Sequence, residues 1–281
     1  MPIHGSLTEL LAAGVDADTI TTPPATRRDL VLEALAAGVH VVADKPFAPT
    51  AAAGQELADA AQEAGRVLSV FHNRRFDADL LTLRGVLGSG RLGEIWRVHS
   101  RFDLDQPEAG PDGGLLRDLG THLVDQMMWL LGPVSSVHAQ WDEVELPAGR
   151  TDAAFVLSLR HDSGVTSCVS STKLTHLRER TLRAYGSAGS YVVTSADVQA
   201  EAVAAGRHPA EERAGWGFDD PSRAGLLRTA AGEERVPSVQ GDYAAFYEQF
   251  ARACAGEGPH RPPRTRVSRC SPCSTPRGRA P

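Results

Sequence analysis

The sequence predicts an α/β protein in which an incomplete doubly wound parallel sheet precedes a second α/β domain with a mostly antiparallel sheet. Over residues 1–75, short apolar runs alternate with helical patterns of about ten to fifteen residues, as in parallel βαβ units. After residue 150, alternating apolar runs are joined by turn residues, as in antiparallel hairpins. The composition, 42% hydrophobic and 23% charged, is that of a globular protein.

The first 75 residues predict three helices and three strands, and the chain enters this region through a helix. Ser6 and Glu9 form a capping box at the start of a short helix that ends near Gly14. We expect strands over 18–22, 40–44 and 67–72, and the longer helices over 27–37 and 50–64. No strand with a glycine-rich turn precedes them, so the phosphate-binding first βα unit of a dinucleotide-binding sheet is not expected here.

One segment has the letters of a phosphate-binding loop but the wrong context. Gly88-Ser-Gly90-Arg-Leu-Gly93 fits the spacing GxGxxG. A helical pattern over 76–87 precedes it and an alternating strand pattern over 94–102 follows it. Phosphate capture needs a strand, a turn and then a helix N-terminus, so we interpret this segment as a helix-to-strand turn.

The rest of the chain predicts a hairpin-rich second domain. We expect a loop over 107–114, a helix over 115–131 and strands over 153–159, 165–171, 181–185 and 191–193. Turns at 161–164 and 186–189 join these strands in pairs. Residues 196–240 are expected to form loops and 243–255 a helix. The predicted divisions are a partial dinucleotide-binding domain over 1–75, a substrate and oligomerisation domain over 76–260, and an irregular tail over 261–281.

Charge and cysteine content limit the partners. The net charge of −6 gives no electrostatic support for nucleic-acid binding. No apolar run is long enough to cross a membrane and no signal sequence is evident, so we expect a soluble cytoplasmic protein. Cys270 and Cys273 have CxxC spacing in a tail with six Arg and no acidic residue. Without a second pair of ligands we expect reduced thiols and no metal.

The strongest candidate for catalysis is the segment from Gly113 to Asp125. On a helix, Asp118, His122 and Asp125 share one face. A carboxylate one turn from an imidazole can orient the ring as a general base that takes a proton from a hydroxyl. The alternative is an ordinary amphipathic helix with a solvated acid–histidine pair, and this segment by itself favours the alternative.

The two lysines and one polar strand end are further candidates. Lys45 and Lys173 stand beside 27 Arg, so each marks a position where a compact ammonium is preferred. Lys45 follows Asp44 at the carboxyl end of a buried strand, where ligands bind and where an ammonium can stabilise a substrate oxygen. Asn73 and Arg74 follow the third strand and could contact ribose or nicotinamide. A solvated loop lysine and an ordinary polar strand exit are the alternatives.

Together these segments resemble the Gfo/Idh/MocA oxidoreductase family, which includes glucose–fructose oxidoreductase and inositol dehydrogenase. The resemblance extends from about Pro2 to about Gly258, and the branch most similar is that of scyllo-inositol dehydrogenase. Several motifs in the right order favour the catalytic interpretation of the helix. The matching segments are Thr22-Pro23-Pro24, Asp44-Lys45-Pro46, Asn73-Arg74-Arg75-Phe76, Asp118-Leu-Gly120-Thr-His122 and Ala184-Tyr185-Gly186-Ser187.

The resemblance implies a Rossmann domain and an NAD or NADP cofactor. It also implies oxidation of a secondary alcohol on a sugar or cyclitol, and a homo-oligomer formed through the second sheet. His122 would transfer the proton and Asp118 would orient it. Lys45 would contact substrate and nicotinamide, so that Lys45 and His122 converge on one alcohol, and Lys173 completes the substrate set. The residues implied to line the cofactor are Thr22, Pro23, Pro24, Asp44, Lys45, Asn73 and Arg74.

The sequence departs from the family at both ends and at two internal places. The family's first two strands and glycine-rich turn have no counterpart, so we expect weak or no NAD(P)H binding by this chain. Arg27 stands where the family has His, and the 107–114 loop lacks the aromatic and basic residues of relatives. The tail over 261–281 replaces a final helix, which suggests a frame change near residue 260. Gene sequence upstream of Met1 and across residue 260 tests both ideas.

Two other functional classes stay open. A non-catalytic sugar-binding or regulatory relative would bind sugar without dinucleotide, although it would not need Lys45, Asp118 and His122 together. A product of gene decay would fold poorly, because an open sheet edge and exposed apolar surface favour aggregation.

Overall fold

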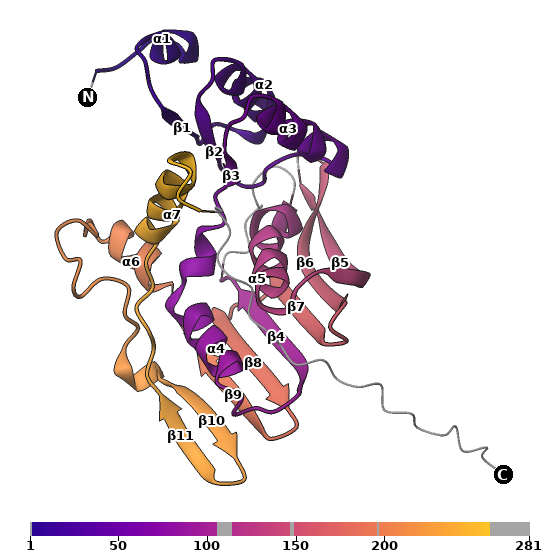
Figure 1. Ribbon diagram of the computed structural model, residues 1–281. Coiled ribbons are helices and arrows are strands. Elements are labelled where there is room, and N and C mark those ends of the chain that lie inside the picture. Colours follow the sequence, from indigo (N-terminus) through magenta and orange to yellow (C-terminus); the bar gives the residue numbers. More distant parts are fainter. Residues whose placement is uncertain (1, 106–113, 147–148, 196, 259–281) are drawn as a thin grey trace. The chain divides into compact units, whose positions relative to one another are not determined.

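The computed structural model describes residues 2–105, 114–146, 149–195 and 197–258 (Figure 1). Its described part forms two compact units, one of residues 2–76 with 242–258 and one of residues 77–241. The first unit therefore includes the helix expected over 243–255, which we had assigned to the second domain. Several predicted segments lie outside the described residues. They are residues 107–113 of the expected 107–114 loop, which include Gly113, and the tail over 261–281, which includes Cys270 and Cys273.

The first unit is built on a parallel sheet in the order β1-β2-β3. Ala17 pairs with His40 on β2, and Val41 pairs with Leu68 on β3. This confirms the predicted Rossmann-like parallel sheet. Its elements are α1 (Leu7–Ala12), β1 (Ala17–Ile20), α2 (Pro24–Ala36), β2 (His40–Ala43), α3 (Ala51–Glu63), β3 (Leu68–Val70), the 3₁₀ turn η1 (Asn73–Phe76) and α7 (Ala244–Cys254).

Both faces of this sheet are covered within the unit. Val41 is buried in an apolar cluster with Val31 and Leu35 of α2. Val42, which alternation turns to the other face, is buried with Phe246 and Phe250 of α7. Burial of these two phenylalanines explains why α7 belongs to the first unit although it follows the second in sequence.

The second unit contains an eight-stranded sheet in the order β11-β10-β9-β8-β4-β7-β6-β5. In this sheet the β4–β7 pair is parallel and every other pair of its described strands is antiparallel, as predicted. Its elements are α4 (Ala78–Gly88), β4 (Ile95–Asp103), the π turn η2 (Leu116–Gly120), α5 (Thr121–Leu131), β5 (Val134–Leu146), β6 (Gly149–His161), β7 (Thr166–Thr172), β8 (Glu179–Gly186), β9 (Gly189–Thr194), α6 (Val198–Ala204), η3 (Pro221–Arg223), β10 (Gly225–Thr229) and β11 (Gly232–Val236).

Helices cover one face of the large sheet. Val98 and Phe102 of β4 are buried in one apolar cluster with Leu83 of α4 and Met127 of α5. His99 and Arg101, which alternate with them, point to the opposite face and are partly or largely exposed. No described helix of the unit contributes to that opposite face, which carries polar residues and the exposed Val156.

Three segments of the second unit differ in how well the sequence predicted them. The Gly88–Gly93 segment is a turn between α4 and β4, as predicted. Residues 196–240 were wrongly predicted as loops, since they contain α6 and the β10–β11 hairpin. Strand β5 was missed, although Val137, Ala139 and Trp141 alternate with His138, Gln140 and Asp142 as in a strand with one apolar side. Within the described ranges, no helix has the length and apolarity needed to cross a bilayer.

A buried histidine fixes the turn between α5 and β5 to the end of β6. His161 is 1% exposed; its Nδ1 lies 2.9 Å from the Gly132 carbonyl and its Nε2 2.8 Å from Ser167 Oγ. Because a carbonyl only accepts, Nδ1 carries the proton and Nε2 accepts from the hydroxyl. Burial lowers the pKa of His161, and the bond to Gly132 opposes this only in part.

We predict that acid destabilises the protein partly through His161. Its folded-state pKa lies below the unfolded value of about 6.5, so the unfolded state binds more protons and stability falls as pH drops below that value. Denaturant titrations of His161→Gln between neutral and mildly acidic pH should show a flatter pH dependence than the wild type. Exposed His208→Gln is the control and should match the wild type. An unchanged slope in His161→Gln would contradict the prediction.

Candidate active site

In the first unit, the predicted cofactor residues follow three neighbouring parallel strands. Thr22 and Pro23 follow β1, Lys45 follows β2, and Asn73 begins the turn after β3. Backbone bonds join these ends, since Asp44 N donates to Ile20 O at 3.0 Å and Phe71 N donates to Ala43 O at 2.9 Å. The carboxyl edge of a doubly wound sheet is where ligands bind. The structure thus brings all of the predicted cofactor residues to one edge of this unit.

One buried atom at this edge suits a ligand. Thr22 Oγ1 is buried and has no hydrogen-bond partner among the described residues. On the next strand end, Asp44 Oδ1 accepts from Lys45 N at 2.7 Å, and the Lys45–Pro46 peptide bond is cis. A buried hydroxyl without a partner costs free energy, which a ligand's polar atom would offset.

These turns fit one half of a dinucleotide better than the other. Their hydroxyl, carboxylate, ammonium and amide groups suit ribose and nicotinamide. Among the described residues of the first unit, no glycine lies in a turn that follows β1, β2 or β3. A close backbone approach to a pyrophosphate, which needs such glycines, is therefore not offered by these turns.

Tyr247 is a further candidate for contact with a ligand at this edge, and it was not among the residues predicted from the sequence. It lies on α7, and its ring is 5.4 Å from the ring of Phe71, at the end of β3. Burial and, to a smaller extent, the Asp44 carboxylate raise the pKa of Tyr247. The available signal was a helix face with four aromatic residues, two of them phenols: Tyr243, Phe246, Tyr247 and Phe250.

In the second unit, the predicted catalytic residues lie on a helix with an irregular start. A single α-helix over 115–131 was predicted, but Leu116–Gly120 is a π turn that leads into α5. This part of the prediction was wrong, since sequence periodicity does not distinguish one wide turn from an α turn. Asp118 lies in the π turn and is partly buried, and His122, in the first turn of α5, is 5% exposed. Single π turns occur often at functional sites.

Strand β6 holds the start of this helix. Asp152 Oδ2 accepts a hydrogen bond from Leu116 N at 2.6 Å. Gly114 has φ +79°, and a Cβ there would lie 1.8 Å from Asp152 Oδ1, so only glycine fits. Asp152 was not predicted from the sequence. The paired glycines 113 and 114 were the only local signal of a close contact at this point.

Gly120 permits the other close contact of the motif. A Cβ at Gly120 would lie 3.2 Å from Phe155 Cζ of β6 and 2.7 Å from Leu116 Cδ1. The helix therefore lies on β6 with its backbone close to an aromatic ring. This explains physically why glycine stands between Asp118 and His122.

Lys173 lies at the end of β7, next to the same part of β6. Its backbone N donates to Ala153 O at 2.9 Å, and Ala153 is the neighbour of Asp152. Lys173 is 6% exposed, and no described residue forms an ion pair or hydrogen bond with its ammonium. The ammonium itself is not fully buried, so a ligand oxygen can reach it.

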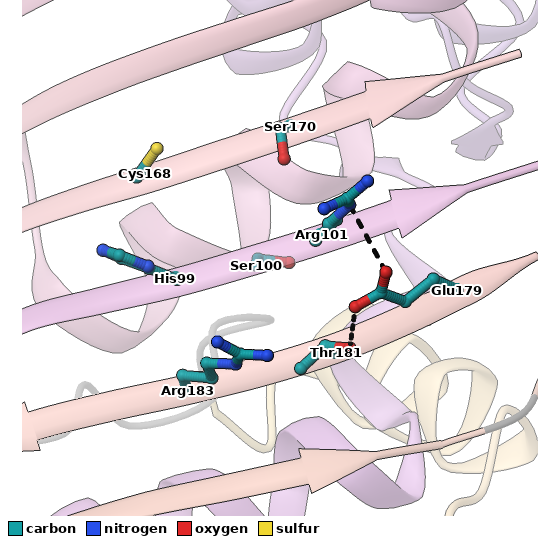
Figure 2. A pocket seen from close by; sticks show the side chains of 8 residues that line it. All are labelled: His99, Ser100, Arg101, Cys168, Ser170, Glu179, Thr181 and Arg183. Carbon is teal, nitrogen blue, oxygen red and sulfur yellow. Dashed lines mark hydrogen bonds and ion pairs between the residues drawn. The ribbon is translucent and has the colours of Figure 1, made fainter. Parts of the chain in front are cut away.

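A separate hollow of about 220 Å³ lies on the open face of the large sheet (Figure 2). There Arg101 Nε lies 3.6 Å from Glu179 and 2.6 Å from Asp103, and Thr181 donates to Glu179 at 2.9 Å. None of the predicted site residues lines this hollow. In the described parts of both units, no cluster of three His, Cys, Asp or Glu is placed to hold a metal ion.

Family models match both units. Residues 3–72 match the oxidoreductase family with an NAD-binding Rossmann fold, and residues 80–192 match the GFO/IDH/MocA C-terminal domain. The chain belongs to the Gfo/Idh/MocA oxidoreductase family. The expected NAD or NADP cofactor is confirmed at the level of this NAD-binding family.

Individual relatives of this Gfo/Idh/MocA protein agree. The uncharacterized oxidoreductase YdgJ of Escherichia coli is 38% identical over 87% of this chain and 72% of its own. The scyllo-inositol 2-dehydrogenase (NADP(+)) IolW of Bacillus subtilis is 31% identical over 83% and 68%. The crystal structure of an oxidoreductase from Bacillus cereus superposes with a TM-score of 0.80 at 29% identity, covering 91% of this chain and 75% of that one.

We predict that Gly120→Ala destabilises the second unit by about 1–3 kcal/mol, because the added methyl overpacks the contact with Phe155. Urea unfolding measures this. Gly85→Ala in the exposed part of α4 is the matched control, where a Cβ meets nothing within 4 Å. It should be neutral or stabilising by up to about 1 kcal/mol. Equal effects of the two variants would contradict the prediction.

Proposed function

We propose that this chain oxidises a secondary alcohol of a sugar or an inositol-like cyclitol, with NAD or NADP as hydride acceptor. The observation that carries the proposal is the buried imidazole of His122 one turn from Asp118 at a π-to-α junction. Membership of the Gfo/Idh/MocA family supports the reaction type, and similarity to IolW supports the cyclitol.

In this proposal, His122 acts as the general base. Its imidazole takes the hydroxyl proton of the alcohol while the carbinol carbon loses a hydride, so that a ketone results. The nicotinamide, when bound, supplies the acceptor for that hydride. Asp118 orients the ring and stabilises its protonated form. Burial of His122 excludes water, which strengthens the interaction with the carboxylate.

The two lysines are assigned to the substrate. Lys173, a largely buried residue of the second unit, supplies an ammonium that suits a hydroxyl oxygen of a polyol. Lys45 is proposed to contact substrate and nicotinamide from the first unit. Thr22, Pro23, Pro24, Asp44, Asn73 and Arg74 are proposed to line the ribose and nicotinamide.

The test is alcohol-dependent reduction of NAD⁺ or NADP⁺ at millimolar concentration, with scyllo-inositol, myo-inositol and aldoses as substrates. We expect His122→Asn to lower turnover roughly 100- to 10,000-fold, as for loss of a general base. His208→Asn, at an exposed position, should have no effect. Absence of reduction with every alcohol, or equal rates for His122→Asn and the wild type, would contradict the proposal.

A second candidate is a non-catalytic sugar-binding or regulatory protein. It would need only the groups of the second unit, His122 and Lys173, which lie on largely buried positions of that unit. Calorimetric titration separates the two. Sugar binding without any dinucleotide binding would favour the second candidate.

We also propose that the chain forms homo-oligomers through the open face of the eight-stranded sheet and that it is cytoplasmic. The uncovered face shown in Figure 2 supports the first idea. Ser170→Arg, which places a bulky charge in the hollow, should lower the molar mass measured by sedimentation, whereas Arg207→Glu elsewhere should not. A monomeric wild type would contradict the assembly. Cell fractionation tests the location, and recovery with membranes would contradict it.

A further inference from the structure

Arg27 is a buried arginine that binds backbone rather than carboxylate. It lies in the first turn of α2 and is 2% exposed. Its Nη2 donates to Thr22 O at 2.6 Å, and its Nη1 donates to Pro46 O. No described carboxylate lies within ion-pair distance of Arg27, and its Nε is buried without a hydrogen-bond partner.

The two carbonyls belong to turns that follow different strands. Thr22 lies after β1 and Pro46 after β2, and these strands are neighbours in the parallel sheet. A guanidinium is a planar, rigid fork, so two bonds from one group fix the separation and orientation of both turns. Removing either bond would release one turn from the other beyond the last strand pairing.

The charge of Arg27 gains little from its surroundings, so the position of the guanidinium explains its role better than charge pairing does. Burial lowers the pKa of Arg27, and the Asp44 carboxylate opposes this to a smaller extent. Asp44 is itself engaged through Oδ1 with the backbone N of Lys45. A buried charge that binds two carbonyls and leaves Nε unsatisfied is a costly way to gain stability. Its distinctive effect is to connect the Thr22 and Lys45 turns.

We propose that Arg27 is a positioning residue that holds the turn carrying Thr22 and the turn carrying Lys45 in fixed register for the nicotinamide half of the cofactor. The expected effect on cofactor binding rests on the proposed function, whereas the two bonds from Arg27 to the turns do not. The Thr22 hydroxyl, buried without a partner, and the Lys45 backbone are each one residue or less from a carbonyl that Arg27 binds. A shift of either turn would change the separation between the Thr22 hydroxyl and the Lys45 backbone.

The first measurement is hydrogen exchange of the whole chain, followed by mass spectrometry. In Arg27→Gln, which can donate to one carbonyl only, segments 20–26 and 44–50 should both exchange roughly 10- to 100-fold faster. Arg27→Lys keeps the charge but lacks the fork, and it should resemble Arg27→Gln. Val31→Ala, in the same helix and fully buried, lowers stability without touching either turn. It should not accelerate these two segments selectively.

The second measurement is titration with NADH followed by nicotinamide fluorescence. We expect Arg27→Gln and Arg27→Lys to weaken binding at least about tenfold, because small displacements of positioning groups have large effects. Val31→Ala should bind as the wild type does.

The results distinguish failure of the positioning role of Arg27 from failure of the proposed function. If only one segment loosens, or if Arg27→Lys restores the wild-type pattern, the positioning role is overturned. If Val31→Ala weakens NADH binding as much as Arg27→Gln does, general destabilisation explains the effect and the role is likewise overturned. If both segments exchange faster in Arg27→Gln but the wild type binds no dinucleotide, the positioning role of Arg27 is supported and the proposed function fails instead.

Discussion

The second unit depends on the close approach of the Asp118–His122 turn to strand β6. Two contacts hold the turn there, the bond from Leu116 N to Asp152 and the near contact of the Gly120 backbone with Phe155. They fix the start of α5, and α5 in turn covers the core of the large sheet. The proposed base therefore lies on an element that contacts with β6 hold in place, as expected of a site on a rigid support.

The first unit follows a different rule. Its proposed ligand groups lie on turns, and the parallel register of three strands gathers those turns at one edge. The sheet ends before the turns begin, so strand pairing alone cannot set the separation of Thr22 and Pro46. Arg27 supplies that connection from the adjacent helix. A helix that covers one face of the sheet thus also organises its edge.

The two faces of the large sheet in the second unit differ. Its strands alternate between a core packed under α4 and α5 and an opposite face that no described helix of the unit covers. An antiparallel sheet of this kind can be packed on one side and face water on the other. The hollow in Figure 2 belongs to the second side, which explains why the proposed catalytic groups are not found there.

The sequence by itself determined the fold class, the order of the main elements, the turn at Gly88–Gly93 and the family, because periodicity, turn residues and ordered motifs are local signals. It also supplied the candidates His122, Lys45 and Lys173. The π turn, the role of Asp152 and the fork of Arg27 were decided only by tertiary structure. Each depends on residues distant in sequence: Leu116 meets Asp152, and Arg27 meets Pro46. No pattern along one segment encodes such a pairing, since it arises only when two elements pack together.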